Sequence, residues 1–362
     1  MKFAQFLPAC LVLAIIGRLI FKLVVIKTPC RKNVDFQWNR VLFLNDSDVS
    51  NVDFTRDSIE WPEDTILPID KCNVERLYVI VVHSAIGNAD RRNRLRGIIE
   101  SLEGERPHLI FSIGRTRNTT LQNEVENESK IFKDLLQTHS LDDYRLLPSK
   151  AHSWIRFLSQ NCTNKIKFVL KIDDDVNVNF NLFKEFLETR ETRKQQVLCS
   201  PFKHIADRRK KSTWYLSEKE FRHRNLGYFC AGLAYIISAD LLPNMLRNSA
   251  YRRVVWLDDW YVTHSLLVGE TVKIYDISSL YFVSETIQDA YRQLSQIKMG
   301  LRPIPMFSHL RPRKFFDQQR QSYLWEQSQQ CLLQLDEDDE LLESEAEQAR
   351  KASTLNNIFI VQ

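Results

Sequence analysis

The stretch Phe168-Val-Leu-Lys-Ile-Asp-Asp-Asp-Val-Asn-Val-Asn179 places three consecutive carboxylates directly after a run of apolar residues. The run 168–172 is typical of a strand that is buried on both faces of a parallel sheet. In open α/β sheets the ligand crevice lies beyond the carboxyl ends of the strands, so we expect the triplet 173–175 at its edge. Adjacent anions repel one another, and a hard cation such as Mn²⁺ or Mg²⁺, shared with a diphosphate, would neutralise them. The alternative is an acidic surface turn that binds no metal.

Other short apolar runs recur along the chain, and segments with helical spacing lie between them. The apolar runs are 77–83, 109–113 and 234–238, and the helical segments are 92–101, 124–137, 149–159, 182–188 and 239–246. An alternation of strand and helix predicts an α/β fold with a mostly parallel sheet that is flanked by helices.

The composition bounds the function classes. The chain has 362 residues, 44% of them hydrophobic and 27% charged, which is enough apolar material for a sizeable core. Lysine and arginine number 50 against 46 aspartates and glutamates, so the net charge is only +4. This small surplus argues against nucleic acid as a partner.

FVLKIDDDVNVN resembles the FVLKTDDDVFVN block of glycosyltransferase family 31, the β-1,3-galactosyltransferase and β-1,3-N-acetylglucosaminyltransferase superfamily. The similarity extends over about residues 76–325, in blocks that keep the family's order and spacing. These blocks are VIVVHSAIGNADRRNRLR, FSIG, DDYRLLPSKAHSWIRFLSQNC, RRKKSTWYLSEKEF and YFCAGLAYIIS. The chain departs from the family where Ile98-Ile99 replaces a Thr-Trp pair and where one glycine, Gly232, stands for the usual two or three.

The resemblance implies a GT-A-like, Rossmann-type domain that transfers galactose or N-acetylhexosamine from a UDP-sugar to a glycan hydroxyl, with inversion and in β-1,3 linkage. Mn²⁺ or Mg²⁺ would assist. In a strand-like turn alternate residues point the same way, so Asp173 and Asp175 can face the crevice while Asp174 faces the protein. The predicted metal ligands are Asp175, Asp173 and His309, and the predicted donor-binding residues are Asp173, Asp174, Arg91, Arg96, Lys150 and Gly232.

The segment Trp256-Leu-Asp-Asp-Trp-Tyr-Val-Thr263 resembles the family's LEDVYVG block, which carries the catalytic base. The acceptor hydroxyl must lose its proton as it attacks the anomeric carbon, and a carboxylate can take that proton. Either Asp258 or Asp259 could serve, and we favour Asp259, which matches the aspartate of the motif. The alternative is that these carboxylates only cap a helix. A catalytically silent glycan-binding or scaffold protein with the same fold is the competing function.

Residues 7–26 are apolar except for Arg18 and Lys22, and their length suffices to cross a bilayer as a helix. We predict an uncleaved signal anchor, with a cleaved signal peptide whose apolar region is 6–17 as the alternative. The count of positive charges around the segment opposes a lumenal carboxyl end. Six cysteines outside this segment and sequons at Asn45, Asn118, Asn127 and Asn161 nevertheless favour the secretory pathway.

These observations predict a single-pass type II Golgi membrane protein with a lumenal catalytic domain. The expected parts are a cytoplasmic tip and anchor (1–27), a stem (28–75), the catalytic domain (76–325) and an acidic tail (326–362). The expected partners are UDP-galactose or UDP-N-acetylhexosamine, a glycan acceptor on a glycoprotein or glycolipid, and the membrane. The basic run formed by Lys203 and residues 208–211 is interpreted as a surface loop.

Overall fold

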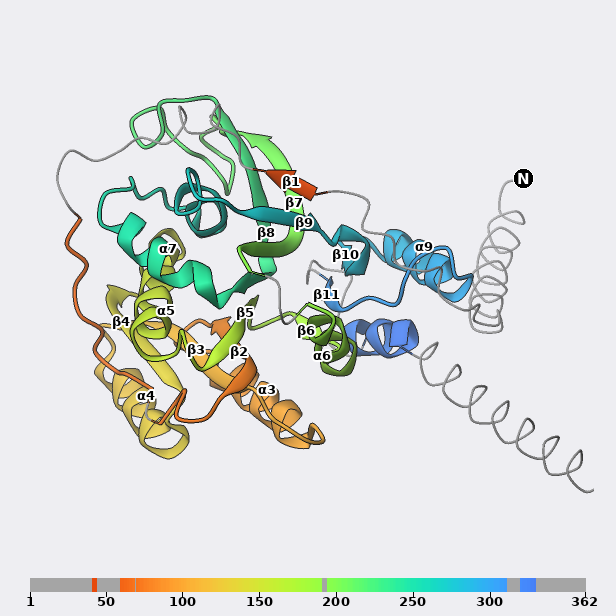
Figure 1. The fold of residues 1–362 in the computed structure, drawn as a ribbon, viewed down its shortest axis with the longest axis horizontal. Coiled ribbons are helices and arrows are strands. Elements are labelled where there is room, and N and C mark those ends of the chain that lie inside the picture. The colour runs from red at the N-terminus through yellow and green to blue at the C-terminus, as the bar shows by residue number, and fades with distance from the viewer. Residues whose placement is uncertain (1–40, 44–58, 69, 191–193, 311–319, 330–362) are drawn as a thin grey trace, which may run out of the picture. The chain divides into compact units, whose positions relative to one another are not determined.

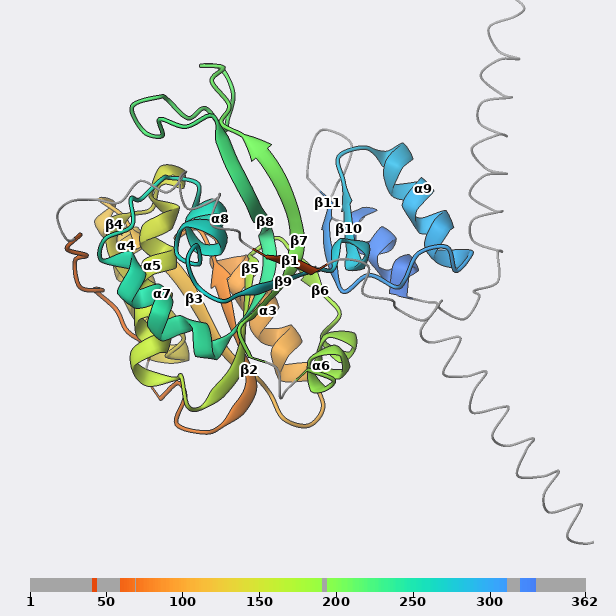
Figure 2. The same ribbon diagram turned by 45° about the horizontal axis from the view of Figure 1, so that its top comes forward.

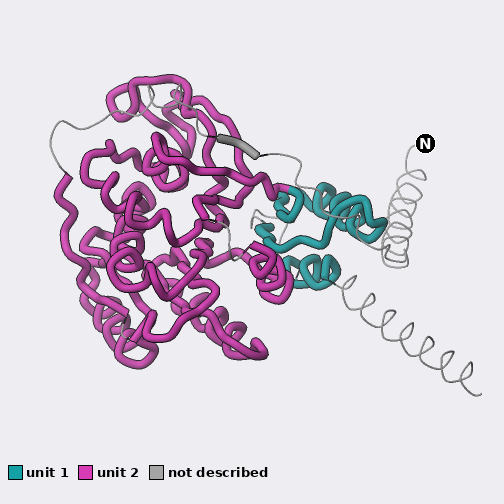
Figure 3. The backbone as a smooth tube through the Cα atoms, in the orientation of Figure 1, with its two compact units in different colours: residues 1–37, 279–362 teal, residues 38–278 magenta. Residues whose placement is uncertain are grey.

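The structure is a computed structural model, and it describes residues 41–43, 59–68, 70–190, 194–310 and 320–329. The predicted anchor, the sequon at Asn45, Cys30, Cys331 and most of the acidic tail lie outside these residues. The chain divides into two compact units (Figure 3), a larger unit of residues 38–278 and a smaller unit of residues 1–37 and 279–362. In the part of the chain that the structure describes, no helix has the length and apolarity needed to cross a membrane.

Strands and helices alternate along the larger unit (Figure 1). Its strands are β1 (Val41–Phe43), β2 (Arg76–His83), β3 (His108–Arg115), β4 (Leu135–Leu141), β5 (Ile166–Asp173), β6 (Asn177–Val178), β7 (Gln196–Ile205), β8 (Asn225–Ser238) and β9 (Lys273–Asp276). Its helices are α3 (Ala89–Ser101), α4 (Thr119–Phe132), η1 (Tyr144–Leu146), α5 (Leu147–Asn161), α6 (Phe180–Glu188), η2 (Ala239–Leu241), α7 (Leu242–Ser249), α8 (Asp258–Trp260) and the π-helix η3 (Tyr261–Ser265).

The main sheet has the strand order β1-β9-β7-β8-β5-β2-β3-β4. Four of the seven strand pairs described in this sheet are parallel, including β5 with β2, β2 with β3, and β3 with β4. The α/β class with a mostly parallel sheet is therefore confirmed. β8 runs antiparallel to both β5 and β7, so the sheet is mixed on one side of β5.

The predicted helix 124–137 is correct only in its first part, because α4 ends at Phe132 and β4 begins at Leu135. Lys133 closes the helix in the left-handed conformation, with φ of 54°. The following Leu-Leu-Gln-Thr run is fully buried and pairs with β3, and this burial decides in favour of a strand.

Helices cover both faces of the parallel part of the sheet. Val79 and Val81 of β2 lie in one core cluster with residues of α5 and α7, among them Trp154. Tyr78 points to the opposite face, where its ring meets Phe183 of α6 edge-on at 4.8 Å. Because successive strand residues alternate between faces, the odd-numbered residues of β2 point toward α5.

The last residues of the predicted stem are irregular in structure and belong to the larger unit. Trp61 stacks on His152 of α5, with 4.2 Å between the ring centroids. A disulfide joins Cys72 to Cys162 at the end of α5, and a second disulfide joins Cys199 of β7 to Cys230 of β8. The sequence left the pairing of the cysteines open, and the structure assigns four of them.

The smaller unit contains η4 (Ser278–Leu280), β10 (Tyr281–Ser284), α9 (Ile287–Lys298) and β11 (Phe307–Leu310). β10 and β11 pair in parallel, and Phe282, Leu294 and Leu310 pack into one core cluster. The predicted metal ligand His309 lies on β11, so it belongs to this unit.

Candidate active site

The candidate site lies at the carboxyl ends of β2 and β5. These strands pair in parallel with Val79 opposite Val169, Val81 opposite Lys171 and His83 opposite Asp173. The face that buries apolar side chains along both strands therefore presents His83, Lys171 and Asp173 at the strand ends. The alternation of side chains along a strand brings these three polar groups together.

The buried ammonium of Lys171 is the centre of the cluster. Its Nζ donates to Asp173 Oδ1 at 2.7 Å and to the carbonyl oxygen of Gly232 at 2.5 Å, and it lies 3.9 Å from Asp258 Oδ2. Burial alone would lower the pKa of Lys171, but Asp173, Asp258 and Asp259 outweigh it and raise this pKa. Lys171 thus stays charged and holds the end of the acidic triplet next to the second acidic pair.

The three carboxylates of the triplet have different surroundings. Asp174 is nearly closed off, and it accepts hydrogen bonds from Ser84 Oγ and Asn88 Nδ2 at 2.8 Å each and from Arg91 at 2.7 Å. Asp173 and Asp175 keep 40% and 34% of their side-chain surface exposed. Asp174 therefore ties β5 to the loop after β2, while its two neighbours remain open to a ligand.

Asp173 has an unusual protonation equilibrium. Desolvation by the surrounding protein atoms raises its pKa, although Lys171 opposes the shift and 40% of the side-chain surface stays exposed. Arg91 bridges Asp174 and Asp175, with its Nη1 3.4 Å from Asp175 Oδ2. Burial would lower the pKa of Arg91, but these two carboxylates raise it.

Asp258 and Asp259 begin α8, and they differ in charge at neutral pH. Burial would raise the pKa of Asp258, but Lys171 and His83 outweigh burial and lower it. Burial, reinforced by the charge of Asp258, raises the pKa of Asp259 to about 7. The pair therefore consists of an ionised carboxylate and a neighbour that can exchange a proton near neutral pH.

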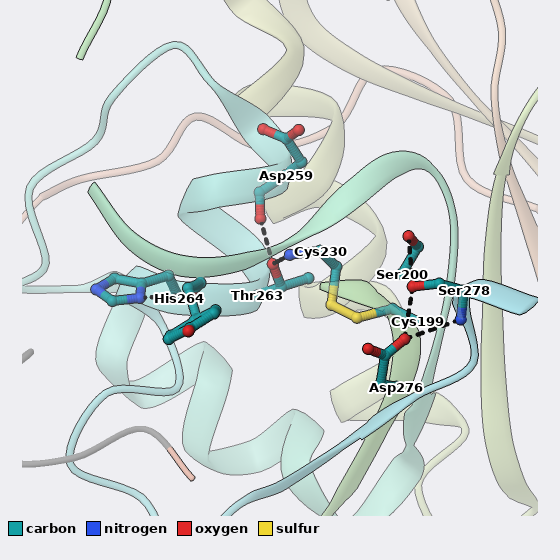
Figure 4. The surroundings of a disulfide bond; sticks show 9 residues. Cys199, Ser200, Cys230, Asp259, Thr263, His264, Asp276 and Ser278 are labelled. Atoms are coloured by element: carbon teal, nitrogen blue, oxygen red, sulfur yellow. Dashed lines mark hydrogen bonds between the residues drawn. A yellow bond between two sulfur atoms is a disulfide. The ribbon is translucent and has the colours of Figure 1, made fainter. Parts of the chain in front are cut away.

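Gly232 makes room for Asp259. A Cβ atom at this position would lie 3.2 Å from Asp259 Cβ and 3.3 Å from its Oδ2. Behind it, Thr263 Oγ1 donates to the Asp259 carbonyl at 2.6 Å and accepts from the Cys230 amide at 2.9 Å (Figure 4). Strand β8, fixed to β7 by the disulfide of Cys230, thus positions the start of α8.

His83 is a neutral imidazole with a defined tautomer. The indole nitrogen of Trp154 donates to His83 Nε2 at 3.1 Å, and because an indole N–H only donates, His83 carries its proton on Nδ1. This nitrogen lies 3.3 Å from Asp258 Oδ2. Burial, with a further contribution from Lys171, lowers the pKa of His83 to about 4. Trp154 and His83 thus form a buried chain that ends at Asp258.

The structure does not bring every predicted residue into the cluster. Lys150 is buried beside it, where its Nζ donates to the Ser84 carbonyl at 2.8 Å and pairs with Asp142. Four of the five N–H donors of Arg96 are bound elsewhere, to Asn93, Asp134 and Glu128. Arg96 therefore joins α3 to α4 and the residue before β4, away from the cluster. His309 belongs to the smaller unit, and its role as a metal ligand stays a prediction.

The surroundings of Asp173 and Asp175 fit a divalent cation that is bound partly by substrate. Among the residues that the structure describes, no group of three or more His, Cys, Asp or Glu side chains could hold a metal ion. Mg²⁺ and similar ions are commonly held by one or two carboxylates together with substrate phosphates and water, which requires no such group. Two half-exposed carboxylates beside a closed one match that arrangement.

A hollow of about 510 Å³ lies at the carboxyl ends of the parallel strands. Three arginines and two aspartates line it: Arg115 at the end of β3, Arg117 after β3, Arg145 of η1, and Asp142 and Asp143 after β4. Guanidinium groups suit phosphate oxygens because they can donate two parallel hydrogen bonds. The hollow thus has the position and charge of an anion-binding crevice.

Sequence reasoning did not assign roles to Lys171, Trp154 or Asp142. Lys171 carried a signal, because a lysine inside an apolar strand, two residues before Asp173, must point to the same face as that aspartate. Trp154 gave no such signal, since its donation to His83 depends on how α5 packs on β2.

Comparisons with known proteins identify the family of the chain. The family model described as Galactosyltransferase matches residues 90–278, which end where the larger unit ends. Beta-1,3-galactosyltransferase 1 of Mus musculus is 28% identical over 189 residues, 51% of this chain and 58% of that protein. UDP-GalNAc:beta-1,3-N-acetylgalactosaminyltransferase 1 of Mus spicilegus is 26% identical, over 57% of this chain and 64% of that protein. The similarity thus spans somewhat more than half the length of these relatives.

The similarity to solved structures is weaker. The apo form of the WbbM bifunctional glycosyltransferase has a TM-score of 0.39 and 9% identity, over 73% of this chain and 50% of that one. Apo mouse xyloside xylosyltransferase 1 has a TM-score of 0.32 and 10% identity, over 66% of this chain and 99% of that one. The match to the family model covers more than half of the 362 residues, and the chain belongs to the galactosyltransferase family, glycosyltransferase family 31.

Proposed function

We propose that this protein is a metal-dependent, inverting hexosyltransferase. It moves galactose or N-acetylhexosamine from a UDP-sugar to a glycan hydroxyl, in β-1,3 linkage. The observation that carries the proposal is the meeting of two acidic groups around one buried ammonium, since Lys171 Nζ lies 2.7 Å from Asp173 and 3.9 Å from Asp258. An inverting transfer requires both functions around one sugar, with the base for the attacking hydroxyl on the side opposite the departing diphosphate.

Asp259 is the proposed general base. A base is most effective when its pKa lies near the operating pH, and the pKa of Asp259 is raised to about 7. Asp258 is unsuited to accept the proton, because Lys171 and His83 lower its pKa. Asp258 instead stays charged and holds both Lys171 and His83 in place.

Asp175 and Asp173 are the proposed metal ligands. A bound Mn²⁺ or Mg²⁺ would neutralise charge that develops on the leaving UDP. Arg91, which bridges Asp174 and Asp175, keeps the two carboxylates in a fixed orientation. The arginine-lined hollow at the ends of β3 and β4 is the proposed donor pocket, with Arg115, Arg117 and Arg145 toward the phosphates.

Two variants test these roles separately. Asp175→Ala should weaken Mn²⁺-dependent UDP binding at least about tenfold, measured by calorimetry, because it removes a ligand that the ion shares with the diphosphate. Asp259→Asn should leave the affinity for the UDP-sugar unchanged and abolish transfer. Asp90→Asn, at an exposed position on α3, is the matched control for both measurements. Unchanged UDP affinity in Asp175→Ala, or retained turnover in Asp259→Asn, contradicts the corresponding role.

Slow hydrolysis of the UDP-sugar distinguishes an enzyme from a catalytically silent scaffold. A competent site transfers the sugar to water at a low rate when Mn²⁺ is added, whereas a silent glycan-binding protein leaves the donor intact. Hydrolysis by the unmodified protein in a panel of UDP-sugars would also identify the donor.

We further propose that the protein acts in the Golgi lumen, held by residues 7–26 as a type II membrane anchor. The disulfides Cys72–Cys162 and Cys199–Cys230 support an oxidising compartment. The sequon asparagines Asn118, Asn127 and Asn161 are all exposed, as N-glycosylation requires. Treatment of the protein from secretory cells with an N-glycosidase should lower its apparent mass, and an unchanged mass contradicts this localisation.

A further inference from the structure

The outer part of the hairpin formed by β7 and β8 extends beyond the main sheet (Figure 2). We call residues 201–229, with the long loop between the two strands, the arm. The catalytic roles proposed above use β8 only at Gly232, so the arm itself has no assigned function.

The arm carries the positive charge of the protein. Residues 203–224 contain eight lysines and arginines against three aspartates and glutamates, a net charge of +5. The whole chain has a net charge of only +4, so all its other residues together carry a net charge of −1. Such segregation of charge creates a local field that attracts anions.

Most of these cations are available to a ligand. Arg208 is bound to backbone carbonyls within the loop, and Arg209 pairs with Asp207 at 2.6 Å. The six others are exposed, and within the described part of the chain none of them forms an ion pair with a carboxylate; they are Lys203, Lys210, Lys211, Lys219, Arg222 and Arg224.

The arm is hollowed where its two strands pass into the loop. A depression of about 480 Å³ is lined by Lys203, His204, Ile205, Arg224 and Asn225. Large apolar side chains lie exposed on the arm, with Trp214 46% and Ile205 51% accessible. Exposed cations, together with an exposed aromatic side chain on the same loop, suit a ligand that has both anionic groups and flat apolar faces, as acidic sugars do.

The loop of the arm is fastened to the candidate active site. Arg145, which lines the arginine hollow, donates to Glu220 at 2.7 Å and to the Tyr215 carbonyl at 2.9 Å. The guanidinium of Arg145 also lies 4.8 Å from the ring of Trp256, two residues before Asp258. Through Arg145, the loop of the arm therefore adjoins the residues that surround the catalytic carboxylates.

The distance along β8 sets the size of the ligand. Gly232, at the active site, lies seven positions after Asn225, at the depression, which corresponds to roughly 23 Å of extended strand. A single acidic group cannot occupy both places. An extended chain with several negative charges can.

We infer that the arm binds an extended anionic glycan, sulfated or carboxylated, as the acceptor of the transfer reaction. That the glycan is the acceptor of the reaction rests on the proposed function. That the arm binds the glycan rests on the arm alone. The cations steer and hold the charged chain while its terminal sugar reaches Asp259.

The test compares two triple variants that remove the same charge. The arm variant is Lys203→Ala/Arg222→Ala/Arg224→Ala, and the control is Arg94→Ala/Lys130→Ala/Lys167→Ala, whose exposed residues lie on α3, α4 and β5. The probes are a chondroitin sulfate hexasaccharide and its desulfated, carboxyl-reduced counterpart, which carries no charge, with binding measured by interferometry at low salt and at about 0.5 M salt.

The arm variant should bind the sulfated hexasaccharide about tenfold more weakly than the unmodified protein at low salt, whereas the control should stay within about twofold. The difference should shrink at high salt, and the uncharged glycan should bind weakly to all three proteins. Equal binding by the arm and control variants, or equal losses with both glycans, overturns the inference. The same three proteins are also tested for binding to vesicles of anionic lipid. If the arm variant loses binding only to these vesicles, the ligand is a membrane surface and the inference is overturned.

Metal-stimulated UDP-sugar hydrolysis, measured on the same three proteins, separates this inference from the proposed function. The arm residues are outside the catalytic cluster, so hydrolysis should be equal in all of them. If hydrolysis is absent throughout while the arm variant loses glycan binding, the proposed function fails and the binding surface stands. If hydrolysis is present but glycan binding is unaffected by the arm, only the present inference fails.

Discussion

Replacing Asp259 by asparagine should make the protein more stable while it removes activity. Asparagine has the same shape, and its Oδ1 can still accept the hydrogen bond of 2.8 Å that the Trp260 amide donates to Asp259. The substitution removes only the negative charge, which burial and the neighbouring Asp258 disfavour. A catalytic group whose charged form destabilises the folded protein is a common origin of a trade-off between stability and activity.

The size of the gain follows from the pKa. A rise from the ordinary value of 3.8 to about 7 corresponds to about 4 kcal/mol of unfavourable free energy when the folded protein must ionise Asp259. The protonation of Asp259 is coupled to that of Asp258, and the surrounding groups can rearrange around the charge. Both effects reduce the free energy that the substitution recovers. We therefore expect a gain in the free energy of unfolding of about 2 kcal/mol at pH 8.

The gain should depend on pH with a definite sign. In the unfolded chain Asp259 releases its proton near pH 4, whereas the folded protein retains it up to about pH 7. Between these values the folded state binds more protons, so the contribution of Asp259 to stability is lost as the pH rises. The asparagine variant lacks this loss, and its advantage should grow from near zero below about pH 4 to its full size above about pH 7.

Urea unfolding of the two proteins at a series of pH values measures the difference directly. Glu126→Gln, at an exposed position on α4, is the control and should change the free energy of unfolding by less than about 0.5 kcal/mol at every pH. Parallel pH profiles for the Asp259→Asn variant and the unmodified protein, or a less stable variant at pH 8, would refute the assignment of a raised pKa to Asp259.

Three further substitutions test the packing of the site. Gly232→Ala would put a methyl group 3.2 Å from Asp259 Cβ, so transfer should fall at least about tenfold with a stability loss of only about 1 kcal/mol; an unchanged rate contradicts the close approach. Arg96→Met leaves buried carboxylates without their partner and should cost about 3 to 5 kcal/mol in urea unfolding, with no change in the affinity of the folded protein for UDP; weaker UDP binding would return Arg96 to the donor site. Replacing Cys199 and Cys230 by serine should cost about 3 to 4 kcal/mol, measured against the unmodified protein under non-reducing conditions, and an equal stability would show that the disulfide is not formed.

The parallel half of the sheet could be predicted because each of its buried strands is a continuous apolar run. The run 168–172 became β5, and the run 77–83 became most of β2. β4 could not be recognised in this way, since residues 135–141 follow α4 after two residues and only their burial against β3 makes them a strand. The antiparallel direction of β8 was equally invisible, because an apolar run does not reveal which neighbour it pairs with.

The sequence by itself determined that an acidic triplet follows a buried strand, and that a second acidic pair begins a helix 85 residues after it. The side-chain alternation along β5 also determined that Lys171 and Asp173 share a face. Only the tertiary structure decided that Lys171 reaches Asp258, that Trp154 fixes the tautomer of His83, and that Arg96 serves α4 rather than the site. The reason is physical: local periodicity is written in neighbouring residues, whereas contacts between distant segments depend on how all the elements pack around one core.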